Sequence, residues 1–188
     1  MKRAFLAGLL LLLGGGVCAA QSAAEAGLLW GTRGLKNADL NAVFGSGTAF
    51  TPYAALNLYP GGSIGISLET GYVREAPVGL FGDLFRLQVS VAEVFFRQEW
   101  RAGAISPYLK IGPGLAFYKI TIDSPYLKAY NAHGSDISFA VAGGAKVHLG
   151  KRIFLSGEIR YGVLWLDPFD DKVDLGGVRA QAGIGILL

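Results

Sequence analysis

Residues 176–188 read GGVRAQAGIGILL, and this stretch decides the fold. The apolar residues fall at every second position, at Val178, Ala180, Ala182, Ile184, Ile186 and Leu188. The positions between them are polar or glycine, so the pattern has a period of two and predicts a β-strand. Its length is about that of a tilted strand that crosses a bilayer. An unpaired apolar edge strand invites aggregation, so we expect this strand to pair with the first strand and close a barrel.

The first twenty residues have the pattern of a cleaved secretory signal. Basic residues at positions 2 and 3 precede the apolar run 4–13, and small residues lead to Ala20. We predict cleavage after Ala20, which leaves 21–188 as a single barrel domain. Cys18, the only cysteine, would leave with the signal, so no disulfide is expected in the mature chain. Acylation of Cys18 is the alternative, although Val17 stands where a lipoprotein signal has Gly or Ala.

Composition separates this chain from helical membrane proteins and nucleic-acid binders. Hydrophobic residues make up 52% of it, yet beyond the signal no apolar run approaches the roughly 20 residues of a membrane helix. Without Lys2 and Arg3, fifteen basic residues remain against 14 acidic ones. No basic patch interleaved with aromatic residues is present, which argues against a nucleic-acid partner. The apolar residues are instead spread along the sequence at alternate positions, as they are in β-strands.

Seven further segments alternate in the same way. The expected strands are 24–35, 49–59, 63–73, 86–100, 106–122, 137–149 and 153–165. Short and long connections join them in turn, as the short periplasmic turns and longer external loops of outer-membrane barrels do. The predicted fold is all-β: a transmembrane, antiparallel, eight-stranded up-and-down β-barrel. Its loops would span 75–83, 123–136 and 166–174, and the first loop would hold a short helix over 37–44, capped by Asn37 and ended by Gly45.

Two strands carry an expected irregularity. In the fourth, Leu87, Val89 and Val91 follow one apolar phase, whereas Val94 and the residues after it follow the other. This shift predicts a β-bulge near Val91 and Ala92. In the fifth, Pro113 is a weak point because proline donates no ladder hydrogen bond.

Alternation alone leaves open which face meets lipid. With the apolar face inside and the charges in solvent, the chain would be a soluble barrel of lipocalin type. Lipid outside is favoured because the polar phase is rich in Gly, Ala and Ser, which fit the narrow interior of eight strands. Aromatic residues near the strand ends would form interfacial girdles; these are Trp30, Tyr53, Tyr59, Tyr72, Trp100, Phe117, Tyr118, Tyr161 and Trp165.

The signal, the eight strands with alternating links and the closing strand resemble the small outer-membrane β-barrel family of OmpA, OmpX and OmpW type. That family usually ends on Phe or Trp, where this chain has Leu188. The resemblance implies the bacterial outer membrane as location, its lipid as partner, and insertion by the barrel-assembly machinery. We expect a monomer.

Charged residues fall on the polar phase and would meet inside the barrel. The predicted lumen charge network comprises Glu69, Glu93, Arg97, Glu99, Lys110, Lys146, Glu158, Arg160 and Arg179, with Arg86 as a further basic member. One interpretation is a constriction that selects ions. We favour the other, an ion-pair network that closes the lumen, because buried charges must be paired and eight strands leave little free bore.

Three local patterns suggest other chemistry. His133 and Ser135 have the spacing of the lipid A deacylases, but they fall in an expected loop away from Glu158, and a triad needs hydrogen-bond contact. His148 has no second ligand at zinc spacing. The loop 167–174 offers four carboxylates, yet it contains Lys172 and lacks the Gly and Glu of a calcium-binding hand. We therefore predict no catalytic residue, cofactor or metal.

The sequence thus predicts a non-enzymatic integral outer-membrane barrel with a structural or surface-interaction role and a lumen plugged by paired charges. The alternative is a narrow porin-like channel for small or hydrophobic solutes, similar to OmpW. A soluble periplasmic carrier of lipocalin type is the third interpretation.

Overall fold

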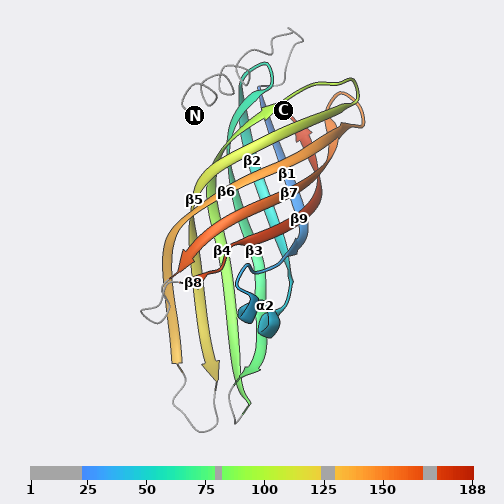
Figure 1. The fold of residues 1–188 in the computed structure, drawn as a ribbon. Helices are drawn as coiled ribbons and strands as arrows, with labels where there is room; N and C mark the ends of the chain where they lie inside the picture. The colour runs from blue at the N-terminus through green and yellow to red at the C-terminus, as the bar shows by residue number, and fades with distance from the viewer. Residues whose placement is uncertain (1–22, 79–81, 124–129, 167–172) are drawn as a thin grey trace, which may run out of the picture.

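The computed structural model describes residues 23–78, 82–123, 130–166 and 173–188. The predicted signal 1–20 lies outside these residues, as does most of the acidic loop 167–174. In the described part of the chain, strands form the wall of a barrel and one short helix lies at one end of it (Figure 1).

Eight of the described strands make the wall, and every neighbouring pair is antiparallel. They are β1 (Ala24–Arg33), β2 (Gly47–Tyr59), β3 (Gly62–Val78), β4 (Asp83–Glu99), β5 (Ile105–Asp123), β6 (Tyr130–His148), β7 (Ile153–Leu166) and β9 (Gly177–Leu187). The last strand pairs with both β7 and β1, which closes the ring. The predicted eight-stranded up-and-down barrel is confirmed. A further two-residue strand, β8 (Val173–Asp174), pairs with the end of β7.

The two ends of the barrel differ. At one end, called here the turn end, the connections 60–61, 100–104 and 149–152 join β2 to β3, β4 to β5 and β6 to β7. The opposite end, called the helix end, carries α2 (Ala38–Phe44) between β1 and β2. The C-terminus lies at the turn end (Figure 1).

The two faces of the wall follow the predicted alternation over most of its length. Leu155, Ile159 and Ile184 point outward and are 44%, 66% and 52% exposed, whereas Glu158 and Arg179 point inward and are 4% and 2% exposed. Soluble monomers rarely expose so large a continuous apolar surface, and lipid is the solvent that suits it. The opposite orientation, which the lipocalin interpretation requires, is therefore wrong.

Helix α2 begins and ends where its capping residues predict. The Asn37 side-chain oxygen accepts a hydrogen bond from the Leu40 N–H at 3.0 Å, which satisfies a donor that the first turn leaves free. Gly45 follows the last turn with φ at 66°, a conformation that glycine adopts without strain. No helix in the described residues is long and apolar enough to cross a membrane.

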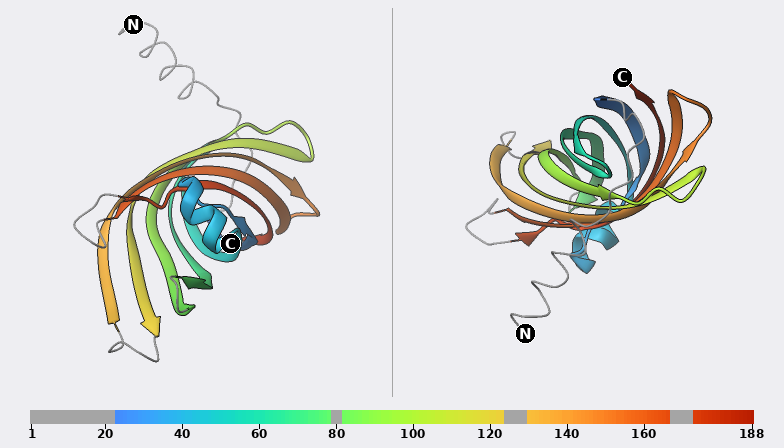
Figure 2. Two further views of the ribbon diagram at one scale, coloured as in Figure 1. Left: turned by 60° about the horizontal axis from the view of Figure 1, so that its bottom comes forward. Right: turned by 90° about the horizontal axis from the view of Figure 1, so that it is seen from above.

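Strands β3 to β6 are longer than predicted. The expected loops 75–83 and 123–136 are largely strand, because β3 continues to Val78, β4 begins at Asp83 and β6 begins at Tyr130. In this region polar residues such as Glu75 and Lys119 lie on the outer face, so the hydrophobic alternation fades although the ladder continues. The four strands extend beyond β1 and β9 at the helix end (Figures 1 and 2).

The bulge lies in β3, and its prediction in β4 is wrong. Glu69 pairs with Val91 and Tyr72 pairs with Val89, so β3 contains one extra residue between them. Gly71 has φ at 93° there, which suits a bulge because glycine lacks a Cβ. The bulge turns Tyr72 into the barrel, where it is fully buried. The wall is continuous at Pro113, which pairs with Phe139 of β6.

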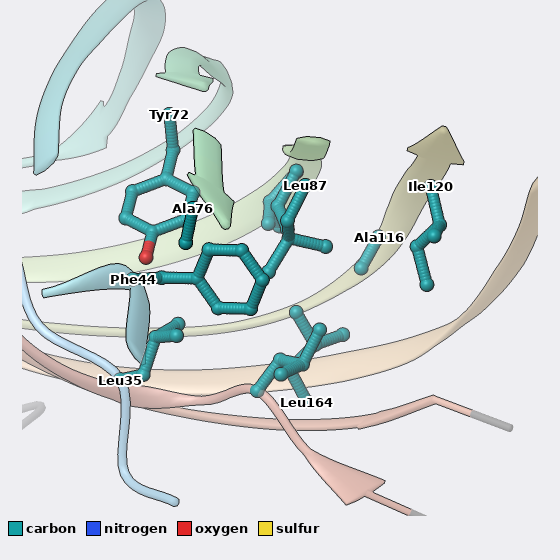
Figure 3. Packing of buried hydrophobic residues seen from close by; sticks show 11 residues of the cluster. Leu35, Phe44, Tyr72, Ala76, Leu87, Ala116, Ile120 and Leu164 are labelled. Carbon is teal, nitrogen blue, oxygen red and sulfur yellow. The ribbon is translucent and has the colours of Figure 1, made fainter. Parts of the chain in front are cut away.

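Apolar side chains fill the interior near the helix end (Figure 3). This outer apolar cluster consists of Leu35, Phe44, Tyr72, Ala76, Leu87, Val89, Val91, Ala116, Ile120, Leu164 and Leu175. The Phe44 ring of α2 lies among the side chains contributed by the strands (Figure 3). Thus β4 keeps one phase throughout, and Leu87, Val89 and Val91 point inward like Glu93. The sequence pattern that suggested a phase shift has another cause: the inward residues of β4 are charged toward the turn end and apolar toward the helix end.

The aromatic residues divide between the two faces. Tyr53, Tyr72 and Tyr118 point into the barrel, contrary to their predicted place in the girdles. Trp30 and Phe117 are exposed on the outer face, as a girdle requires. Tyr53 instead packs edge-on against Phe95 inside, with ring centroids 6.3 Å apart.

Candidate functional site

Between the outer apolar cluster and the turn end, charged side chains lie in the interior in three groups. The first, called here the arginine layer, contains Arg33, Arg160 and Arg179 with Glu69 and Glu93. The middle group contains Tyr108, Lys110 and Glu158. The turn-end group contains Glu25, Arg97, Glu99 and Lys146.

The arginine layer joins both sides of the barrel. Arg33 of β1 donates to Glu69 of β3 over 2.8 Å, and Arg179 of β9 donates to the other oxygen of the same carboxylate. Arg160 of β7 pairs with Glu93 of β4. Arg33 also donates to the Leu175 carbonyl at 2.9 Å. Every one of these five charged side chains is almost fully buried, so each pair is shielded from water and salt.

The middle group holds one carboxylate with two donors. Lys110 Nζ lies 2.7 Å from Glu158, and the Tyr108 hydroxyl donates to the same carboxylate over 3.1 Å. The Lys110 ammonium also lies 5.2 Å from the centre of the Phe95 ring, a cation–π contact that adds to its stabilisation. Strands β5 and β7, which are not neighbours in the wall, are linked through this pair.

The turn-end group is a chain of alternating charges. Lys146 Nζ lies 2.6 Å from Glu25 Oε2 and 2.7 Å from Glu99 Oε2. Arg97 Nη1 lies 2.7 Å from the other oxygen of Glu25. His148 lies beside this group, with Nε2 3.2 Å from the Ser106 hydroxyl. Two acids, Glu25 and Glu99, meet two bases, Arg97 and Lys146, so the group is electrically balanced.

Comparison with known proteins identifies the architecture. Neither a family model nor a curated protein matches the sequence. Among solved structures, the N-terminal β-barrel domain of Pseudomonas aeruginosa OprF is 13% identical, with a TM-score of 0.55 over 88% of this chain and 97% of that chain. Neisserial surface protein A is 14% identical, with a TM-score of 0.54 over 88% and 96%. Ail, the attachment invasion locus protein of Yersinia pestis, is 11% identical, with a TM-score of 0.56 over 88% and 98%.

The chain has the fold of the small outer-membrane β-barrels. At these identities the likeness concerns the backbone, and the lumen side chains have to be interpreted from this chain alone. In an outer-membrane barrel of eight strands the interior is about wide enough for side chains to fill it. The apolar cluster and the three charged groups lie in this interior.

The structure places all nine residues of the predicted network inside this outer-membrane barrel fold, and it adds two. The nine are Glu69, Glu93, Arg97, Glu99, Lys110, Lys146, Glu158, Arg160 and Arg179. Sequence reasoning missed Glu25 and left Arg33 out of the network, although both fall on the inward phase of β1. Arg86, predicted as a further basic member, instead lies outside the lumen and pairs with Glu75 near the helix end, because β4 has no bulge to turn it inward.

The hydrolase pattern does not form a site in the described residues. His133 and Ser135 lie on β6, in a segment that was predicted to be a loop, and both face outward. Glu158 lies opposite Gly144, roughly 30 Å along the strand from Ser135 at about 3.3 Å per residue. Its carboxylate is already engaged by Lys110 and Tyr108.

The residues considered as metal ligands do not form a metal site in the described part of the chain either. No group of three or more His, Cys, Asp or Glu among the described residues is placed to hold a metal ion. The carboxylates at positions 167, 170 and 171 of the acidic loop 167–174 lie outside the described residues. Asp174, its last acid, accepts hydrogen bonds from Lys36, the Leu164 N–H and the Gly176 N–H, at 2.7, 3.1 and 2.8 Å. It links the end of β7 to Gly176, just before β9, and to Lys36.

Burial and hydrogen bonding act in opposite directions on Asp174. Partial burial raises the pKa of its carboxyl, but the hydrogen bonds from Lys36 and from the two backbone N–H groups outweigh it and lower the pKa below the usual value of 3.8. The carboxylate therefore remains charged throughout the neutral range.

Proposed function

We propose that the protein is a non-enzymatic integral protein of the bacterial outer membrane, with a structural or surface-interaction role and a lumen closed by paired charges. Residues 1–20 direct its export, the barrel-assembly machinery inserts it, and outer-membrane lipid surrounds the finished monomer. The outward apolar face and the fold shared with OprF, neisserial surface protein A and Ail support this location. The proposal includes no nucleic-acid partner and no cofactor.

The observation that carries the proposal is the way the ion pairs cross the bore. Glu69 connects β3 to β1 and β9, while Lys146 connects β6 to β1 and β4. Solutes would have to separate these pairs, and an unpaired buried charge costs about 3–5 kcal/mol. Each group therefore acts as a barrier to passage as well as a link between opposite sides of the wall.

The helix end supports a surface-interaction role. There β3 to β6 extend past the closed part of the barrel, and α2 packs its Phe44 into their inner face. The strands that extend in this way form a platform held by its own apolar core. Among the similar structures, one is named as a surface protein and another as an attachment protein; those names describe these proteins, and for this chain they suggest where a partner would be sought.

Planar-bilayer recording tests the closed lumen. The full chain, refolded and inserted, should give no steady unitary current, and steady currents would refute closure. Insertion has to be shown in the same sample, by the different gel mobility of unboiled and boiled protein recovered from the bilayer lipid. A silent bilayer with inserted protein supports the proposal.

A second candidate function is a narrow conduit for small or hydrophobic solutes. The observation in its favour is the outer apolar cluster, together with the wall beside it: β6 pairs with β7 from Ser138 onward, so residues 130–137 extend past that pairing in the described residues. Vesicles that contain the protein and a quenchable apolar dye distinguish the candidates. Faster dye entry than into empty vesicles favours the conduit, and equal rates favour the closed barrel.

A further inference from the structure

The arginine layer places three positive charges on three adjacent strands at one level. Arg160 of β7 lies directly opposite Arg179 of β9, and Arg179 lies directly opposite Arg33 of β1. Their side chains are no more than 2% exposed. Like charges directly opposite each other in a sheet repel, and burial strengthens the repulsion because the interior screens it weakly.

The acids that face this row do not balance it. Glu69 pairs with Arg33 and Arg179, and Glu93 pairs with Arg160. Three positive charges thus meet two negative ones among the described residues. The middle and turn-end groups are balanced, with Glu25, Glu99 and Glu158 against Arg97, Lys110 and Lys146. Of the three charged groups, the arginine layer alone therefore carries a surplus positive charge.

Hydrogen bonding shows the same surplus. Arg160 contacts Glu93 through Nη2, while its Nε and Nη1 are buried and have no hydrogen-bond partner among the described residues. The Nε atoms of Arg33 and Arg179 are also buried without a partner, whereas the carboxylates of the layer leave a single buried oxygen free, Glu93 Oε1. Buried donors of a charged group are costly to leave without an acceptor. Water would supply an acceptor, but it would leave the surplus charge uncompensated.

We propose that the arginine layer binds one small monovalent anion of the halide class, held by Nη1 of Arg160. One such ion supplies both the missing acceptor and the missing negative charge, whereas a multiply charged anion such as phosphate would overcompensate. The outer apolar cluster on one side and the balanced middle group on the other keep bulk water away, which strengthens the attraction between the anion and the guanidinium.

Bromide is the direct probe, because its anomalous scattering distinguishes it from water. The full chain is refolded into detergent with sodium bromide present, so that an occluded site fills while the barrel closes, and is then crystallised. An anomalous peak within hydrogen-bond distance of Arg160 Nη1 supports the proposal. Density at that position without an anomalous signal, which indicates buried water only, overturns it.

Thermal unfolding gives a second test, which needs no crystal. At equal ionic strength and a chloride concentration tenfold above the dissociation constant, the melting temperature should exceed that in gluconate by about 3–6 °C. R160Q leaves two arginines and two glutamates in the layer, so the chloride effect should disappear. The matched control K110Q removes a cation from the middle group and should keep it. If either variant does not fold, the wild-type comparison still decides, since equal melting temperatures in the two salts would refute the site.

Discussion

Lys110 of β5 and Glu158 of β7 meet inside the barrel, with Nζ 2.7 Å from the carboxylate. The two strands are separated in the wall by β6, so the pair links two strands that share no backbone hydrogen bonds. Charged residues that are buried this deeply are stable only when each is paired with a residue of opposite charge. The stability of the barrel should therefore depend on such pairs far more than on the ion pairs at its ends.

Removal of Glu158 tests this dependence. E158A leaves the Lys110 ammonium and the Tyr108 hydroxyl without their acceptor, so we expect the free energy of unfolding to fall by about 3–5 kcal/mol. Urea unfolding of the refolded protein in micelles measures it. The control is E75A, whose pair with Arg86 is partly exposed and should contribute no more than about 1 kcal/mol. Equal losses in the two variants would show that Glu158 is not in a buried network.

The bulge in β3 requires glycine. G71A puts a Cβ on a residue with φ at 93° and within about 3.0 Å of the Phe50 ring, so the variant should lose about 1–2 kcal/mol. G157A is the matched control, because a Cβ there meets nothing within 4 Å and φ is not positive; its stability should change by about 0.5 kcal/mol or less. A neutral G71A would argue that the register shift lies elsewhere.

The hydrogen bonds that Asp174 accepts should be lost in acid. Its pKa is lowered in the folded protein, so the stabilisation is complete above the ordinary pKa of 3.8 and is lost as the pH falls through the lower folded value. Hydrogen exchange at the Leu164 and Gly176 amides, which donate to Asp174, measures this locally. Protection, corrected for the intrinsic rate, should drop below about pH 4, and D174N should lack both the protection and its pH dependence.

Phe44 anchors α2 in the outer apolar cluster. F44A removes a buried ring and should cost about 3 kcal/mol in the free energy of unfolding. V43A removes a neighbouring side chain of the same helix that is 46% exposed, and its cost should stay below about 1 kcal/mol. Thermal unfolding of the two variants in one detergent compares them. Similar melting temperatures would show that α2 does not pack into the barrel.

The sequence predicted the strands best where the interior is polar. From β7 and β9 the alternation could be followed residue by residue, because Glu158, Arg160 and Arg179 alternate with large apolar residues. At the helix end the same reasoning failed for Leu87, Val89 and Val91. The interior there is apolar and the outer face of β4 carries Arg86, Gln88 and Ser90, which is the reverse of the rest of the wall. Glu25 was missed although it shares the inward phase of Arg33. The pairing of particular acids with particular bases depends on register across the bore, which no single strand encodes.

Orientation in lipid is the central claim: apolar side chains face hydrocarbon and charged ones meet inside a closed ring. Gel electrophoresis of the detergent-extracted outer-membrane fraction, with and without boiling, tests it most directly. A closed barrel resists the gel detergent, so the unboiled protein should migrate as a compact species that shifts to its unfolded position on heating. Recovery of the protein in the soluble fraction, with the same mobility before and after boiling, would contradict the account.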